Sequence, residues 1–594
     1  MKHFLTFTAP LVIFLLGSFL FFFLDYRYWY MFMEQYTIFL YTGEYLCGLL
    51  GQAGGMNEYL SAFVMQCFHL PFAAPLCLTA LLWLMTAALF SAAGSVLAGR
   101  PLVRLLCFLP AFMFCLFPVE SVAPIMATVT GLWAAAGYSS VKDARTRVAL
   151  GLALVTALYP LAAPAHMIAA AAMMAHECGR AGRKMFLAAS GLLAWAALLP
   201  LIAMRTVYVV SMREAFIGKH IFHPEYPLPP SFWYLSFSLI VVWVVMVAVR
   251  RRDRPLAVGR VRRYIAPSVM LTAYSLVVIY GGHPLEQAYM YDHLARGERW
   301  GDIAAHASLH PVKDKDALIY ANLAYLHTGA FNNNLMRLPQ IGEEGLMPYD
   351  PKTRLGLIEA AEVSWALNHT NAAQRFAFVG VLSSERGAQP RLMRRLIETY
   401  IVNEEYKAAA KYIGILEKTA FYKSPMKKYR PLLHPEGSGS QTPTPTGSVT
   451  LMEWVEKRRR LNPVTDNHYD PAKALPQAIA ALLNDHPDNA AAFTYGMGYL
   501  LMYKGLVDFM AYMEKVKGEK LPVVYQEAIC VYYTAVVNNP EAIRAYAVEP
   551  AVYNRFLTYM QQVSRISPAL LARQYGDTYY YYAQFIQPPE NTRR

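Results

Sequence analysis

The chain has 594 residues, of which 56% are hydrophobic and only 16% are charged. This composition is too apolar for an ordinary soluble protein, and the length allows several domains. Of the formal net charge of +13, residues 1–282 carry +10, from 20 Lys and Arg against 10 Asp and Glu. The remaining residues carry only +3. A nucleic-acid-binding module is therefore excluded, because it would concentrate Lys and Arg on the soluble part of the chain.

The first half of the chain contains nine apolar segments that we expect to cross a membrane, since about 20 apolar residues span the hydrocarbon as a helix. They lie at residues 5–24, 73–97, 103–119, 121–138, 147–163, 164–177, 185–204, 232–249 and 264–281. The first segment lacks a small-residue cleavage site and ends in aromatic residues at positions 26–30. It therefore predicts a retained anchor rather than a removed signal peptide.

The positions of Lys and Arg predict the orientation, because basic residues are retained on the cytoplasmic side. With nine spans and a cytoplasmic N-terminus, sixteen Lys and Arg fall in cytoplasmic segments and four in the opposite loops. If residues 147–177 formed one long helix, the spans would number eight and the basic cluster at 250–263 would face outward. We therefore expect a multi-pass protein of the bacterial inner membrane with everything after Gly282 in the periplasm.

Residues 25–72 form the first long external loop, and its periodicity predicts one or two helices along the membrane surface, broken at Gly54-Gly55. Asp25 lies at the outer end of the first span, where a carboxylate serves as a general base or binds a divalent cation beside a lipid-borne substrate. Glu34 is a second candidate carboxylate. The alternative is an interfacial Asp25 that pairs with Arg27 or with a lipid headgroup.

Residues 205–231 form a second long external loop, which is basic. Arg and Lys pair well with phosphate oxygens, so this loop predicts a site for the phosphate of a polyprenyl carrier. The alternative is attraction to anionic lipid. Its candidate substrate-binding residues are Arg205, Arg213, Lys219, His220 and His223. The pair His220-x-x-His223 has no third ligand in place, so no metal site is assigned, and the only cofactor left open is a divalent cation.

Among the seven cysteines, those inside apolar segments have no metal-ligand spacing and are expected to pack as small core residues. Cys47 and Cys67 lie in the first external loop. They form a disulfide if that loop faces an oxidising space and the geometry allows it, and otherwise they stay free.

The second half of the chain contains recurrent helix pairs with small and aromatic residues at packing positions. The clearest unit begins at Asp485 and continues through Tyr495, Gly498 and Gly505 to Tyr512. Such units resemble tetratricopeptide repeats, in which 34-residue helix pairs stack and share a core. We therefore expect an α-solenoid over residues 283–434 and 451–594. Residues 435–450, rich in Ser, Thr, Pro and Gly, are expected to be a flexible linker.

The arrangement of residues 1–282 resembles the GT-C superfamily of polytopic membrane glycosyltransferases. The shared features are a carboxylate directly after the first span, a long amphipathic first external loop, short irregular middle spans and a second long basic external loop, together with a helical extracytoplasmic C-terminal domain. The resemblance implies that a carboxylate of the first external loop, here Asp25 with Glu34 as a second, acts as base or metal ligand. It also implies that basic residues of a later loop, here Arg213 and Lys219, hold the lipid phosphate.

The sequence thus predicts an all-α protein with a transmembrane bundle and an extracytoplasmic helical domain. The first functional hypothesis is a glycosyltransferase that moves a sugar or glycan from a polyprenyl-phosphate donor to an extracytoplasmic acceptor. The second is a non-enzymatic envelope scaffold whose repeat domain docks protein partners. Membrane lipid and a protein partner or acceptor are the expected binding partners, and nucleic acid is not.

Overall fold

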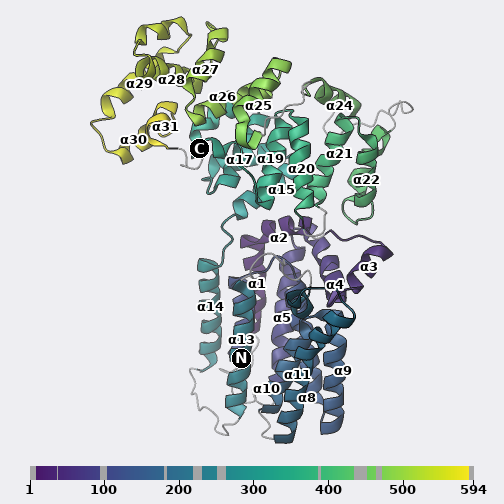
Figure 1. Ribbon diagram of the computed structural model, residues 1–594. Helices are drawn as coiled ribbons and strands as arrows, with labels where there is room; N and C mark the ends of the chain where they lie inside the picture. Colours follow the sequence, from purple (N-terminus) through teal and green to yellow (C-terminus); the bar gives the residue numbers. More distant parts are fainter. Residues whose placement is uncertain are drawn as a thin grey trace. The chain divides into compact units, whose positions relative to one another are not determined.

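The computed structural model describes residues 9–36, 38–93, 104–178, 183–218, 230–250, 262–384, 389–433, 451–462 and 471–587. Over these residues the chain is all-α, with helices joined by short turns and without a β-strand (Figure 1). They form two compact units. The first comprises Met1–Glu286 with Lys418–Phe421, and the second comprises Gln287–Glu417 with Tyr422–Arg594.

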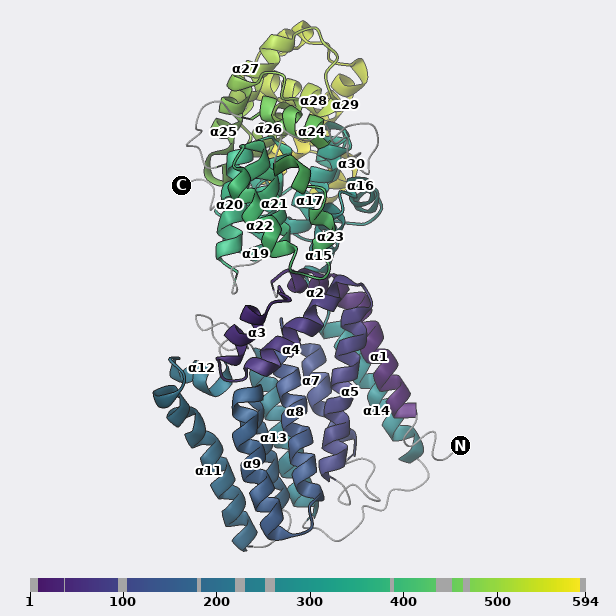
Figure 2. The same ribbon diagram turned by 90° about the vertical axis from the view of Figure 1, so that its right-hand side faces the viewer.

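The helices of the first unit run from α1 to α14. Their bounds are α1 Ala9–Asp25, α2 Arg27–Met33, α3 Gly43–Leu50, α4 Gly55–Met65, α5 Ala73–Ala93, α7 Leu109–Leu116, α8 Ala123–Ser140, α9 Ala144–Ala162, α10 Ala165–Cys178, α11 Arg183–Thr206, α12 Met212–Ile217, α13 Pro230–Arg250 and α14 Arg262–Tyr280. Helices α5, α8, α9 and α10 run side by side (Figures 1 and 2).

Three described helices are long and apolar enough to cross a membrane, namely Ala73–Ala93, Met185–Thr206 and Phe232–Val249. Ala9–Asp25 with Arg27–Tyr36, bent by 69°, makes a fourth if the pair is one span. These helices indicate a membrane protein and correct the expectation of about nine spans. Helices at the other expected spans are either too short, such as α10 with 14 residues, or not apolar enough, such as α8 and α9 with 18 and 19 residues. The helices formed at two expected spans, Leu106–Leu116 and Ile265–Tyr280, are shorter than a bilayer requires.

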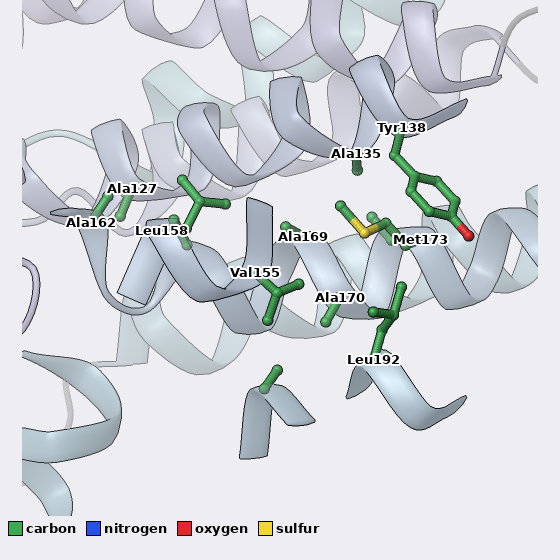
Figure 3. Packing of buried hydrophobic residues seen from close by; sticks show 13 residues of the cluster. Ala127, Ala135, Tyr138, Val155, Leu158, Ala162, Ala169, Ala170, Met173 and Leu192 are labelled. Carbon is green, nitrogen blue, oxygen red and sulfur yellow. The ribbon is translucent and has the colours of Figure 1, made fainter. Parts of the chain in front are cut away.

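Small side chains bring the central helices of the first unit close together. The buried core of α8, α9, α10 and α11 is rich in alanine, and Figure 3 shows Ala169, Ala170 and Met173 of α10 among residues of the neighbouring helices. A Cβ atom at Gly131 of α8 would lie 2.6 Å from the Ala165 carbonyl oxygen, so only glycine fits there. The expected separation of α9 from α10 is confirmed, because Ala163 and Pro164 interrupt the helix.

Residues 25–72 were expected to form one or two helices, whereas the structure has three, α2, α3 and α4, at one end of the long helices of the first unit (Figure 2). Their position along a membrane surface stays a prediction. The chain breaks between α3 and α4 as expected, and Gly54 adopts φ +75° there. Asn57 Nδ2 donates to the Ala123 carbonyl oxygen at 2.9 Å, which fixes α4 at the N-terminal end of α8. Cys47 and Cys67 are both free.

The second unit is built from shorter helices. Their bounds are α15 Glu286–Arg296, α16 Trp300–Leu309, α17 Lys315–His327, α18 Phe331–Asn334, α19 Arg354–Ala366, α20 Thr370–Leu382, α21 Pro390–Val402, α22 Tyr406–Leu416, α23 Lys423–Met426, α24 Leu451–Arg460, α25 Pro471–Asp485, α26 Ala490–Tyr503, α27 Leu506–Met513, α28 Val523–Val531, α29 Pro550–Gln562, α30 Pro568–Tyr575 and α31 Tyr579–Phe585. Sequence neighbours from α19 to α22 pack against one another. The linker expected at 435–450 lies outside the described residues.

Buried arginines join separate helices within the second unit. Arg391 of α21 pairs with Asp292 of α15, and Arg395, one turn further on, binds Glu362 of α19 at 2.8 Å and Glu398 at 2.7 Å. These groups are nearly inaccessible to solvent, so each charge is compensated locally. The alignment of α15, α19 and α21 is therefore specified by charge as well as by apolar packing.

Candidate functional site

The end of α1 is held by a hydroxyl group from the next residue. Tyr26 separates α1 from α2, and its φ of −139° ends the helical path. Its side-chain hydroxyl donates to the Gly281 carbonyl oxygen at 2.6 Å, which places the C-terminal end of α14 beside the end of α1. The His283 ring stacks on Trp29 with 5.2 Å between ring centroids. Residues from the two ends of the first unit's sequence thus meet at the corner between α1 and α2.

Glu286, which follows α14 in the sequence, caps the N-terminal end of α2. Its carboxylate oxygens accept hydrogen bonds from Tyr28 N at 2.7 Å and Trp29 N at 3.1 Å, two of the backbone donors that a helix start leaves without a partner. Burial raises the pKa of Glu286 to about 7, although these two N–H groups and Arg27 act in the opposite direction. A carboxyl with this pKa exchanges its proton near neutral pH.

Asp25, the last residue of α1, is half-buried beside this cap. Its carboxylate makes no hydrogen bond or ion pair with the residues that the structure describes. The alternative of an Asp25–Arg27 pair is not the observed arrangement. The Arg27 guanidinium instead lies over the rings of Tyr28 and Phe23, at 4.3 and 4.7 Å from their centroids. Asp25 is therefore a carboxylate available to an incoming group.

Gly282 leaves open space next to Asp25. A Cβ atom built on Gly282 would have the Asp25 Oδ1 atom at 3.8 Å and no nearer neighbour. The backbone therefore approaches the carboxylate without a side chain between them.

Glu34, the second candidate carboxylate, lies in the turn Glu34–Tyr36 beyond the far end of α2. It is 3% exposed, and it accepts a hydrogen bond from Gln35 Nε2 at 2.6 Å. The carboxyl group near Asp25 is therefore that of Glu286 and not that of Glu34. Among the described residues no group of three or more His, Cys, Asp or Glu side chains is arranged to hold a metal ion.

The structure places the predicted phosphate-binding residues only in part. Arg205 is exposed in the last turn of α11, and Arg213 is half-buried in α12, whose start is fixed by a reciprocal Ser211–Glu214 capping box. No described contact joins either arginine to Asp25. Lys219, His220 and His223 lie outside the described residues.

One protein-family model matches nearly the whole chain. A family model described as a family of unknown function, DUF6057, matches residues 2–586. The chain belongs to this family. No curated protein and no solved structure matches it significantly. The family assignment therefore covers both units and leaves the activity of this DUF6057 protein to be argued from its own residues.

A second cluster of charged residues lies in the first unit at the C-terminal end of α8. Arg147 Nε and Glu177 Oε1 are 2.8 Å apart, and both side chains are almost fully buried. Arg147 also donates to the carbonyl oxygens of Val141 and Lys142, and its guanidinium lies 5.8 Å from the Tyr138 ring centroid. Since both charges are matched, this pair is a structural tie between α9 and α10.

Proposed function

We propose that this protein is a membrane glycosyltransferase that moves a sugar or glycan from a polyprenyl-phosphate donor to an acceptor outside the cytoplasm. The observation that carries the proposal is the unpaired, half-buried carboxylate of Asp25 at the corner between α1 and α2. A structural carboxylate in such a position is normally paired or hydrogen-bonded. An accessible one beside Glu286 is suited to accept a proton.

In the proposed reaction Asp25 removes the proton from the acceptor hydroxyl. The hydroxyl oxygen forms a bond to the anomeric carbon, and the bond from that carbon to the phosphate oxygen breaks. The polyprenyl phosphate leaves with the bonding electron pair, and basic side chains stabilise its charge. Arg205, Arg213, Lys219, His220 and His223 are proposed for that role, and Glu34 is kept as a second candidate carboxylate.

An apolar cleft of about 50 Å³ between α7, α8, α10 and α13 supports a lipid-linked substrate. Its lining includes Phe114, Ile168 and Leu239, with Thr128 and Ser236 as polar members. Only 17% of the Phe232–Val249 span is buried, so α13 is open to surrounding lipid. A hydrocarbon chain would enter such a narrow cleft from the bilayer without crossing water.

The proposed location of the reaction is the periplasmic side of a bacterial inner membrane. Tyr30 of α2 donates to the Val119 carbonyl oxygen, which places Asp25's corner near the start of α8. Helix α8 then runs 18 residues to the opposite end, where Lys142, Arg145 and Arg147 lie. Retention of basic residues in the cytoplasm favours that opposite end as the cytoplasmic one.

The test is an Asp25→Asn substitution in cells that depend on the protein. We expect the lipid-linked donor to accumulate and the transferred glycan to fall at least about a hundredfold, the usual scale for loss of a general base. The matched control is Asp143→Asn, because Asp143 is an exposed N-cap at the other end of the bundle and asparagine preserves that cap. Mass spectrometry measures the amounts of the lipid-linked donor and of the transferred glycan in cells with each variant.

One result would replace this proposal with the scaffold function. That result is an unchanged glycan profile in Asp25→Asn cells, together with complete loss of the cellular function after deletion of residues 287–594. Protein amounts are measured for every variant, so that instability is separated from loss of chemistry. The two functions then give opposite results in the same cells.

A further inference from the structure

A polar pocket of about 320 Å³ opens on the second unit beside α20, the C-terminal end of α21 and the turn before α22. Its volume falls within the range of roughly 300–1,000 Å³ that is common for small-ligand sites. Three of its lining side chains are amides, two are aromatic, and two carry opposite charges. All of them belong to one unit of the fold.

The amide side chains of the pocket are oriented by one another. Asn403 Nδ2 donates to Asn371 Oδ1 at 3.1 Å and to Gln374 Oε1 at 2.8 Å, while Asn462 Nδ2 donates to Asn403 Oδ1 at 3.0 Å. Both N–H groups of the Asn403 amide and one lone pair of its carbonyl oxygen are thus occupied within the protein. Because the carbonyl oxygens of Asn371 and Gln374 face Asn403, their NH₂ groups are directed away from it as donors.

Two aromatic rings complete the lining. Phe378 is 42% exposed, so part of its ring is open to solvent. Tyr400 is 9% exposed and stacks on Tyr412, with 5.9 Å between centroids and 14° between ring planes. One ring is therefore fixed and the other offers its surface to a ligand.

The remaining lining residues, Arg375 and Glu405, carry opposite charges. Neither sign dominates, so the pocket has no preference for a strongly anionic or cationic ligand. It presents planar amides, one cation, one anion and an exposed ring. These groups supply both hydrogen-bond donors and acceptors beside an apolar ring.

We propose that this pocket binds one or two sugar units of a neutral carbohydrate. Each hydroxyl of a sugar both donates and accepts a hydrogen bond, so neighbouring hydroxyls match side chains that offer both kinds of group. The apolar C–H face of a pyranose ring packs on the electron-rich face of Phe378. The proposal is independent of catalysis at Asp25, because its residues belong to the second unit and its readout is binding alone.

The experiment uses the full chain in lipid nanodiscs, because maltoside detergents carry a sugar headgroup that would compete. Maltohexaose, chitohexaose, mannohexaose and xylohexaose are titrated separately by isothermal calorimetry. We expect at least one to bind. Phe378→Ala should weaken that binding about tenfold or more through loss of the stacking surface. Asn371→Ala should weaken it several-fold, and Asn403→Ala should do the same by releasing the amides that it orients.

The matched control is Leu382→Ala, since Leu382 lies at the end of the same helix, is 64% exposed and does not line the pocket. The affinity of this variant for the oligosaccharide should stay within about twofold of that of the unchanged protein. Two results overturn the proposal. One is the absence of binding by all four oligosaccharides at millimolar concentration. The other is binding that survives Phe378→Ala and Asn371→Ala alike.

Discussion

Arg147 and Glu177 of the first unit form a buried ion pair, with their side chains 4% and 0% exposed. Glu177→Leu leaves an arginine without its counterion, and Arg147→Met leaves a carboxylate and two backbone carbonyl oxygens without donors. We expect each single change to cost about 3–5 kcal/mol, with Arg147→Met the larger. The double variant should cost less than either single one. Thermal unfolding midpoints of the purified protein measure this order, and a double variant that is the least stable would contradict it.

At this scale the sequence predicted one member of the candidate site. Asp25 was found because it directly follows a long apolar run, which is a local signal. Glu286 was missed, because only the hydrogen bonds to Tyr28 and Trp29 bring it to the start of α2, across 258 and 257 residues of sequence. No local pattern marks such a cap. The predicted roles of Arg213 and Lys219 stay predictions.

Close packing between helices depends on glycine at the crossing of α8 and α10. Gly131→Ala would place a methyl group 2.6 Å from the Ala165 carbonyl oxygen and 3.1 Å from the Ile168 side chain. We expect it to lower the free energy of unfolding by about 1–3 kcal/mol. Gly137→Ala, in the same helix, meets nothing within 4 Å and should be neutral or stabilising by up to about 1 kcal/mol. Denaturant titration of the two variants measures the difference, and equal effects would contradict it.

Helix boundaries were predicted best where glycine or proline interrupts the sequence. Gly54, with its positive φ, precedes the start of α4, and Pro164 lies in the turn between α9 and α10, so both helix breaks fall where expected. The spans were predicted worst. An apolar residue contributes equally to hydropathy whether it lies in a helix or in the turn after it. Residues 103–119 therefore read as one span, although the apolar helix there covers only Leu106–Leu116.

The proposed orientation of the whole molecule predicts which cysteines a membrane-impermeant maleimide reaches. Cys47 is free and exposed in α3, at the end of the first unit that carries Asp25. Ser140 is exposed at the other end of α8. In spheroplasts, a chain with Cys47 as its only cysteine should be labelled, whereas one with only Ser140→Cys should be labelled after permeabilisation alone. Labelling in the reverse order would invert the orientation and move Asp25 to the cytoplasm.

At the scale of the chain, composition predicted the contrast between an apolar first half and a mixed-charge second half. It did not reveal the ion pairs of Arg391 and Arg395, because pairing of distant charges leaves no periodic signal. The amide network around Asn403 was equally hidden, since its members come from separate helices and turns. Resemblance to tetratricopeptide repeats stays a prediction for this unit.

The cap that Glu286 provides also decides where the protein can be divided. The sequence placed the end of the membrane part at Gly282, four residues before that carboxylate. A polypeptide that stops at Gly282 would lack His283 and Glu286, and the first N–H groups of α2 would lose their acceptors. Because an unsatisfied buried donor costs about 1–3 kcal/mol, the corner beside Asp25 would loosen. Expression of the membrane part alone should therefore extend through Glu286 and the first turn of α15.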